Sequence, residues 1–278
     1  MALEEDVGTG DVTSAWTVEA EATASGRMIA KQGGVICGLD VAQRVFQEVD
    51  LDIDFAPLLR DGDRVQAGDP IAQIHGPARG ILTGERVALN FIQRMSGIAT
   101  MTAHYVQAVQ GTGARILGTR KTTPGLRVLE KYAVRCGGGE NHRFGLYDMV
   151  LIKDNHIAAS GGIRQAVASS RRNMERAPRK LAIEAEVKNS AELAEALEAG
   201  VDRIMLDNMS VAEMARAVKT VREVSGTVEI EASGGVTLAQ LRKIAETGVD
   251  FISVGALTHS AQALDISLLF DEEQGQGK

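Results

Sequence analysis

The sequence is poor in cysteine, proline and aromatic residues. Its 278 residues include 2 cysteines, 5 prolines and 4% aromatic residues. Cys37 and Cys136 are far apart and lack CxxC spacing, which excludes a disulfide framework and a cysteine-rich zinc site and fits a reducing compartment. Aromatic side chains are too scarce for the stacking platforms of proteins that bind single-stranded nucleic acid.

No apolar run in the sequence approaches the length of a membrane span. The N-terminal stretch MALEEDVGTGDVTS is acidic and polar, so no secretory signal is expected before the fold. The formal net charge of -7 argues against a general binder of nucleic acids or membrane surfaces. We therefore expect a cytoplasmic protein that binds small molecules, with no nucleic-acid or membrane partner.

Residues 1–98 have the pattern of a mixed α/β domain with antiparallel strands. Segment 26–32 alternates as a strand does, and segment 40–48 carries the apolar face of a helix. Segment 60–82 is interrupted by DG, AGDP and HGP turns and predicts short strands. A further helix is expected from residue 84 toward Gln110.

Residues 99–278 change rhythm and predict a second, larger domain. Helix-like stretches separate six hydrophobic, strand-like runs, which are 115–119, 149–153, 181–187, 203–207, 228–232 and 251–255. Such β-then-α units indicate a parallel sheet covered by helices. A barrel is favoured over an open dinucleotide-binding sheet, because no G-x-G-x-x-G follows the first strand. Six strands instead of eight indicate an incomplete barrel, or two strands that the pattern hides.

Polar residues recur where these strands end, which is where a β/α barrel gathers its functional groups. They are Arg120, Lys121, Lys153, Asp154, Asn155, Glu184, Glu186, Asp207, Asn208, Glu231, Ser233, Gly234, Gly235, Gly255 and His259. Segment 115–153 also contains eight lysine and arginine residues and only three acidic ones. Helical spacing favours a solvated helix face for Arg127, Lys131 and Arg135, whereas Arg120, Lys121 and Lys153 at strand ends favour a role in an anion site.

Two glycine-rich segments suggest where anions bind. Segment 136–143, CGGGENHR, allows close backbone approach and places the donors Asn141, His142 and Arg143 beside it. A flexible loop with a basic tip is the competing interpretation. The Ser233-Gly234-Gly235 run before a helix predicts a phosphate site, although glycine there also suits a tight turn.

Glu186 and Asp207 are the carboxylates expected to face this site. They suit a Mg²⁺ ion, ribose hydroxyls or a developing sugar cation, and they also suit a structural role as partners of Lys121 and Lys153. No motif indicates a protein nucleophile: Ser233 lacks a G-x-S-x-G setting.

These motifs resemble the quinolinate phosphoribosyltransferase family (nicotinate-nucleotide pyrophosphorylase, carboxylating). The matching stretches cover nearly the whole chain and are EDVGTGDVTS, GERVALNFIQRMSGIAT, GTRKTTPGLRVLEKYAVRCGGGENHRFGLYDMVLIKDNH, IEAEVKN, IMLDNMS, EASGGV and ISVGALTHS. One departure is that only MALE precedes EDVGTGDVT, where family chains usually carry a helical stretch.

The resemblance implies an N-terminal α/β sandwich domain (1–98) followed by an incomplete (open) α/β barrel (99–278), whose last residues could pack back on the N-terminal domain. It implies a pentosyltransferase that joins quinolinate to phosphoribosyl pyrophosphate in NAD biosynthesis, releasing pyrophosphate and carbon dioxide, with Mg²⁺ as cofactor. It also implies a homodimer or larger assembly with shared active sites.

The resemblance assigns roles to individual residues. Arg120, His142, Arg143 and Lys153 would hold the carboxylates of quinolinate, with Arg86 reaching in from the neighbouring subunit. Lys121, Glu186 and Asp207 would hold phosphoribosyl pyrophosphate, and Glu186 and Asp207 its Mg²⁺. Ser233, Gly234, Gly255 and His259 would surround the 5′-phosphate. The expected catalytic residues are Lys121, Lys153, Glu186 and Asp207.

Three other functions are considered. A sibling enzyme of the same fold could use nicotinate or another anion, although the dense cationic cluster favours a dicarboxylate. A phosphate-binding barrel isomerase or synthase would explain Ser233-Gly234-Gly235 and Gly255, but not Arg120, His142 and Arg143 together. A non-catalytic sensor of phosphosugars or pyridines would bind without turnover, and the presence of both carboxylates and both lysines argues against it.

Overall fold

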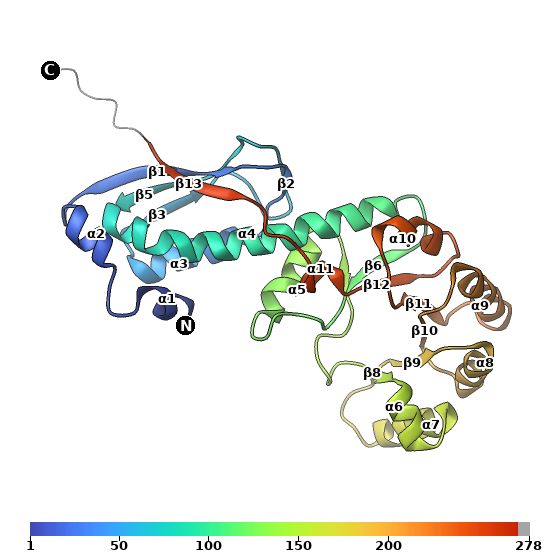
Figure 1. The fold of residues 1–278 in the computed structure, drawn as a ribbon. Helices are drawn as coiled ribbons and strands as arrows, with labels where there is room; N and C mark the ends of the chain where they lie inside the picture. The colour runs from blue at the N-terminus through green and yellow to red at the C-terminus, as the bar shows by residue number, and fades with distance from the viewer. Residues whose placement is uncertain (272–278) are drawn as a thin grey trace. The chain divides into compact units, whose positions relative to one another are not determined.

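The computed structural model describes residues 1–271. It divides into two compact units. The first unit comprises Met1–Ala103, Val128–Gly138 and the segment from Ser260 onward, and the second comprises His104–Arg127 and Gly139–His259. Figure 1 labels the elements of both units.

The first unit contains a four-stranded antiparallel sheet in the order β13-β1-β5-β3. Its strands are β1 (Thr23–Ala30), β3 (Asp54–Pro57), β5 (Pro70–Pro77) and β13 (Ile266–Phe270). A two-stranded sheet pairs β2 (Gly34–Val35) with β4 (Arg64–Val65). The strand expected at 26–32 and the strands expected within 60–82 are therefore confirmed. The C-terminal strand β13 pairs with β1, so a late segment completes a sheet built from early ones.

Helices cover one face of this sheet (Figure 1). They include α3 (Leu39–Val49) and the long α4 (Ala78–Ala108), in agreement with the helices expected at 40–48 and from residue 84. The remaining helices are α1 (Ala2–Val7), α2 (Val12–Thr17) and α5 (Arg127–Cys136), of which α5 lies in the first unit from Val128 onward. The hydrophobic core lies between the sheet and the helices α3 and α4. It includes the fully buried side chains of Met28, Phe46, Ile71 and Ile81.

The second unit is a curled parallel sheet of seven strands in the order β7-β6-β12-β11-β10-β9-β8. Its strands are β6 (Arg115–Gly118), β7 (Glu140–Asn141), β8 (Val150–Ile152), β9 (Ile183–Val187), β10 (Arg203–Asp207), β11 (Glu229–Ser233) and β12 (Phe251–Val254). All six expected strands are confirmed, and β7 is an additional short one. Among the described residues β7 and β8 are edge strands that do not pair with each other, so the barrel is open as expected.

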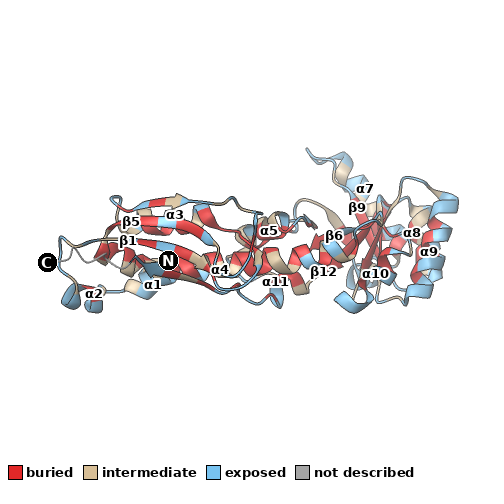
Figure 2. Ribbon diagram, turned by 90° about the horizontal axis from the view of Figure 1, so that it is seen from above, coloured by how far each residue is buried: buried red, intermediate tan, exposed pale blue. Residues whose placement is uncertain are grey.

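Helices between the strands shield the sheet and bury its apolar residues (Figure 2). They are α6 (Asp154–Ser160), α7 (Ile163–Glu175), α8 (Ser190–Ala199), α9 (Val211–Val224), α10 (Leu238–Ala245) and α11 (Ala256–His259). The side chain of Asn189 caps α8, and Ser210 forms a capping box with Glu213 at the start of α9. These caps fix where each chain segment turns from a strand end into the next helix. In residues 1–271, no helix has the combined length and apolar character needed to cross a membrane.

Candidate active site

A cavity of about 780 Å³ lies at the carboxyl ends of the strands in the second unit. This volume is within the range of roughly 300–1,000 Å³ found for small-molecule sites. The predicted site residues that line it are Arg120, Lys121, His142, Arg143, Lys153, Glu186, Asp207, Ser233, Gly234, Gly255 and His259. They come together because neighbouring parallel strands end at the same edge of the sheet.

Of the residues to which the family resemblance assigns a role, Arg86 is the one that does not line the cavity. It lies in the part of α4 that belongs to the first unit, and its side chain is exposed. Burial raises the pKa of the neighbouring Glu85, and the charge of Arg86 opposes that rise. The contribution of Arg86 to a neighbouring subunit's site stays a prediction.

Two arginines from different segments give one side of the cavity its cationic character. Arg120 follows β6, and Arg143 follows β7. Each has a buried Nε atom that makes no hydrogen bond to the described residues. The pKa of the Arg143 guanidinium is lowered, first by burial and then by the charge of Arg120. A buried donor without a partner is costly, so an anionic ligand would stabilise both arginines.

Lys153 and Glu186, which also line the cavity, form an ion pair. Lys153 Nζ lies 3.1 Å from Glu186 Oε2, with the lysine partly exposed and the carboxylate mostly buried. On the neighbouring strand β10, Met205 is the register partner of Glu186, and Asp207 comes two residues later on the same face. Both carboxylates line the cavity, where their oxygens are suitable ligands for a Mg²⁺ ion.

Lys121 is held in place at its backbone. Its N–H donates to Thr119 Oγ1 at 3.1 Å, and its carbonyl accepts from Thr258 Oγ1 at 2.7 Å. Gly255 allows the lysine side chain to approach His259, since a Cβ at Gly255 would lie 2.8 Å from Lys121 Cδ and 3.2 Å from His259 Nε2. A larger residue at position 255 would therefore displace the side chains of Lys121 and His259 from the cavity.

The ends of β10 and β11 are joined through Asn208, whose N–H donates to the carbonyl of Ser233 at 2.9 Å. Asn208 has a φ of 53°, and it is the only non-glycine residue with positive φ among residues 1–271. Its side-chain amide donates to Asp207 Oδ2 at 2.9 Å. Gly234 has a φ of 94°, and a Cβ there would collide with the Asn208 amide, so the turn requires glycine.

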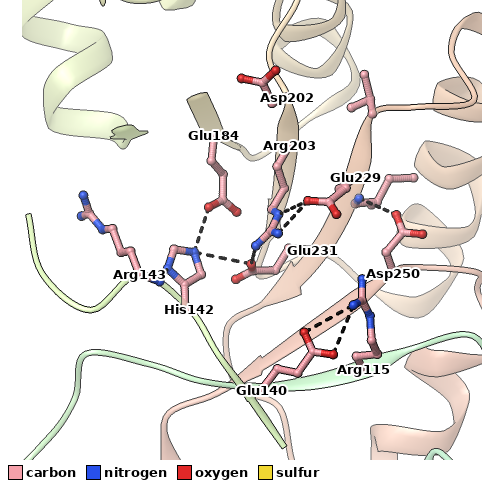
Figure 3. Close-up of polar contacts among 12 residues, drawn as sticks. Arg115, Glu140, His142, Arg143, Glu184, Asp202, Arg203, Glu229, Glu231 and Asp250 are labelled. Atoms are coloured by element: carbon pink, nitrogen blue, oxygen red, sulfur yellow. Dashed lines mark hydrogen bonds and ion pairs between the residues drawn. The ribbon is translucent and has the colours of Figure 1, made fainter. Parts of the chain in front are cut away.

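In the wall of the cavity, His142 and Glu231 belong to a buried polar cluster that also contains Glu184 (Figure 3). The backbone N–H of Arg143 donates to His142 Nδ1 at 2.7 Å, so Nδ1 must be the unprotonated nitrogen. Nε2 then carries the proton and donates to Glu184 Oε2 at 2.8 Å. With both ring nitrogens bonded to the protein, His142 fixes the backbone of Arg143. The direct role in carboxylate binding expected of His142 stays a prediction.

The two carboxyl groups of this cluster have strongly raised pKa values. Burial raises the pKa of Glu184 to about 7, and the charge of Arg203 opposes this rise. Burial and the charge of Glu184 raise the pKa of Glu231 to about 8. Both side chains are fully buried. Near neutral pH the cluster therefore retains protons that exposed glutamates would have lost.

Arg203 is a functional-site neighbour that the sequence analysis did not identify. Its guanidinium donates to Glu229 Oε2 at 2.6 and 3.0 Å, and it lies 3.5 Å from Glu231 Oε2. Its Cζ also lies 4.1 Å from the centroid of the Phe251 ring, above which Arg115 lies at 4.2 Å. The only signal in the sequence was the occurrence of charged residues inside otherwise apolar strands, as in IEAEV and RIMLD.

Comparisons with known proteins agree with this geometry. The model of the "Quinolinate phosphoribosyl transferase, C-terminal domain" matches residues 98–269, and that of the corresponding N-terminal domain matches residues 11–96. The chain belongs to the quinolinate phosphoribosyltransferase family.

Curated relatives and solved structures of this family cover nearly the whole chain. A "Probable nicotinate-nucleotide pyrophosphorylase [carboxylating]" of Synechocystis sp. is 49% identical over 269 residues, which is 96% of this chain and 89% of the relative. The protein of the same name from Bacillus subtilis is 46% identical over 264 residues, covering 95% and 89% of the two chains. The crystal structure of NadC from Streptococcus pyogenes has a TM-score of 0.91 at 43% identity and covers 98% of this chain and 95% of that one. The family resemblance seen in the sequence is thus confirmed.

Proposed function

We propose that this chain is a decarboxylating quinolinate phosphoribosyltransferase. It would convert quinolinate and phosphoribosyl pyrophosphate into nicotinate mononucleotide, pyrophosphate and carbon dioxide, as a step of NAD biosynthesis. The names of the full-length relatives support this activity. The observation that carries it is the pair Arg120 and Arg143, whose buried Nε atoms lack partners among the described residues of a cavity that Lys153 also lines. That donor set suits a dianion better than a monocarboxylate.

In this proposal the cationic side of the cavity holds quinolinate. Arg120 and Arg143 donate to its two carboxylates, and Lys153 supplies a third positive charge. His142 acts as a positioning residue for Arg143 through the bond from the Arg143 N–H. Fixed donors of this kind hold the ring in one orientation, so its nitrogen faces the second substrate.

The opposite side of the cavity would hold the phosphoribosyl donor. The 5′-phosphate fits the open backbone at Ser233 and Gly234 with Gly255 and His259 nearby, because glycine there leaves N–H groups accessible to an anion. Lys121 is available for the pyrophosphate, where it offsets negative charge on the leaving group.

Glu186 and Asp207 are the residues that fit a Mg²⁺ ion, since their oxygens line one cavity and oxygen is the ligand atom that Mg²⁺ prefers. When bound, the ion would neutralise charge on the pyrophosphate. Because Lys153 pairs with Glu186, the same carboxylate would link the quinolinate side of the cavity to the phosphoribosyl side.

The reaction needs no protein nucleophile. The ring nitrogen of quinolinate attacks C1′ of the sugar while pyrophosphate departs. The nitrogen then carries a positive charge, which stabilises the electron pair left on the ring when the adjacent carboxylate leaves as carbon dioxide. That ring carbon then takes up a proton from solvent, which gives nicotinate mononucleotide. Arg120 and Arg143 keep the ring in place, and Glu186 and Asp207 offset the positive charge that develops on the sugar.

We also propose that the chain acts in the cytoplasm as a homodimer or a larger assembly. In this proposal, Arg86 of one subunit completes the quinolinate site of its neighbour. Its exposure on α4 is compatible with such a role.

Steady-state turnover of quinolinate and of nicotinate, each with phosphoribosyl pyrophosphate and Mg²⁺, tests the proposed specificity. We expect turnover of quinolinate alone, and a loss of at least tenfold in kcat/KM for Arg143→Ala, since a charge-assisted hydrogen bond contributes about 1.5–3 kcal/mol. Preference for nicotinate would indicate the sibling enzyme, and tight binding of both ligands without turnover would indicate the sensor.

A further inference from the structure

A second polar cluster lies in the first unit, away from the strand ends described above. Its members are Cys37, Asp61, Tyr132 and Cys136, and we call it the thiol cluster. The two Sγ atoms and a carboxylate oxygen of Asp61 all lie within 4.8 Å of one another. Cys37 lies between β2 and α3, whereas Cys136 is the last residue of α5, so folding brings together two cysteines that the sequence separates widely.

Cys37 is fixed by its surroundings. Its backbone N–H donates to Ser96 Oγ at 2.9 Å, and its carbonyl accepts from the same hydroxyl at 3.2 Å. Its side chain is fully buried, whereas that of Cys136 is only half-buried. The two thiols therefore differ in their access to solvent, and a solvent-borne reagent reaches Cys136 first.

Asp61 already has its own partners. Its carboxylate accepts the N–H of Gly38 at 2.9 and 3.0 Å and the N–H of Leu39 at 3.1 Å, so it anchors the start of α3. The Tyr132 hydroxyl, which has a single proton to donate, is within hydrogen-bonding reach of both this carboxylate and the Cys136 sulfur. These backbone contacts give Asp61 a structural role at the start of α3, and the two sulfur atoms are the part of the cluster that can be oxidised.

Hydrogen bonds within the cluster distinguish the two thiols chemically. The pKa of Cys136 is lowered, first by its hydrogen bond with Cys37 and further by the bond from the Tyr132 hydroxyl, while burial opposes the shift. The pKa of Cys37 is raised by the same hydrogen bond and by burial. A thiol that ionises readily, is partly exposed and has a second thiol beside it has the features of an oxidation-sensitive cysteine.

We propose that Cys136 and Cys37 form a peroxide-oxidisable dithiol, in which Cys136 reacts first and Cys37 resolves the product into an intramolecular disulfide. The Cys136 thiolate attacks a hydroperoxide, an S–O bond forms as the O–O bond breaks, and the departing oxygen takes a proton. Cys37 sulfur then attacks the Cys136 sulfenic acid, the S–S bond forms, and the hydroxyl leaves as water with the Cys37 proton. In total the two thiols lose two hydrogens and the peroxide is reduced.

The disulfide would join the end of α5 to the segment that precedes α3. Gly137 keeps that end close to α4, since a Cβ there would lie 2.6 Å from Thr102 Cβ. Both cysteines are free thiols, and sulfur atoms in a disulfide are about 2.05 Å apart, so the two Sγ atoms must move closer together for the bond to form.

Peroxide treatment of the purified full-length protein tests this proposal, with mass spectrometry of the intact chain and of its peptides. The wild type is expected to lose two hydrogens, to yield a Cys37–Cys136 linked peptide and to regain both thiols with dithiothreitol. Cys37→Ala is expected to accumulate a sulfenic acid on Cys136 that dimedone traps, whereas Cys136→Ser is expected to leave Cys37 unoxidised. Tyr132→Phe is expected to slow the oxidation of Cys136 severalfold while circular dichroism stays unchanged.

Three results would overturn the proposal. They are oxidation of Cys37 in Cys136→Ser at the wild-type rate, over-oxidation of Cys136 in the wild type without the linked peptide, and stoichiometric metal that is released when the thiols are alkylated. The last result would identify the cluster as a metal site. Because Tyr132→Phe keeps both cysteines, its rate still tests the order of reaction if a cysteine variant fails to fold.

Discussion

Replacing Glu231 with glutamine should change how folding stability depends on pH. Burial raises the pKa of Glu231 to about 8 from its ordinary value of 4.5, so the folded protein binds a proton that the unfolded chain releases. For a group with a raised folded-state pKa, the stabilisation is complete below the unfolded pKa and is lost as pH rises through the folded one. Wild-type stability should therefore fall between about pH 4.5 and pH 8.

The size of this change in stability follows from the shift in the Glu231 pKa. Each pKa unit corresponds to about 1.4 kcal/mol, so Glu231 alone should account for a loss on the order of 3 kcal/mol between about pH 5 and pH 8. Glutamine has nearly the shape of the protonated acid and does not titrate. Glu231→Gln should therefore abolish most of the loss of unfolding free energy that Glu231 causes as pH rises. The remaining pH dependence should come from Glu184, whose pKa is raised to about 7.

Urea unfolding at several pH values between about 5 and 8 measures the slope directly. The matched control is Glu229→Gln, which changes the half-buried carboxylate that also accepts from Arg203 and should leave the slope close to that of the wild type. If Glu231→Gln lost several kcal/mol near pH 8 and little near pH 5, Glu231 would be ionised in the folded protein. The inference that Glu231 is protonated in the folded protein near neutral pH would then be wrong.

Three further predictions concern the cavity and the assembly. Arg143→Lys keeps the charge but loses the planar fork, so KM for quinolinate should rise about tenfold while KM for phosphoribosyl pyrophosphate changes little; equal changes in both constants, measured by steady-state kinetics, would contradict the assignment. Gly234→Ala should weaken binding of phosphoribosyl pyrophosphate in calorimetry more than Gly235→Ala does, because both positions have positive φ but a Cβ meets no atom within 4 Å at Gly235. Mixing inactive Arg86→Ala and Lys153→Ala proteins should restore part of the activity if each site combines residues of two subunits, and no recovery after subunit exchange would argue against shared sites.

The strands of the second unit were predictable because each is a hydrophobic run between turn signals. β7 was missed, since it is only two residues long and follows a glycine run that gives no strand pattern. Most of the predicted site residues of the second unit line one cavity, because parallel strands place their carboxyl ends at one edge of the sheet. Strand and turn patterns in the sequence were therefore enough to predict most of the residues that line the cavity.

Features that depend on packing between distant segments were not predictable. Glu184 and Glu231 were recognised as polar residues near strand ends, but their complete burial depends on neighbours from other strands. The bond from the Arg143 N–H to His142 Nδ1, which determines the tautomer, depends on the local backbone path. The proximity of Cys37 and Cys136 depends on how α5 packs, and their spacing along the chain does not indicate it.

We propose that this cavity couples phosphoribosyl transfer to decarboxylation of quinolinate. The most direct measurement uses quinolinate labelled at the carboxylate next to the ring nitrogen and follows carbon dioxide and nicotinate mononucleotide together, with and without phosphoribosyl pyrophosphate. We expect one carbon dioxide for each nicotinate mononucleotide, and none without phosphoribosyl pyrophosphate. Carbon dioxide release without the second substrate, or formation of a mononucleotide that keeps both carboxylates, would contradict this account.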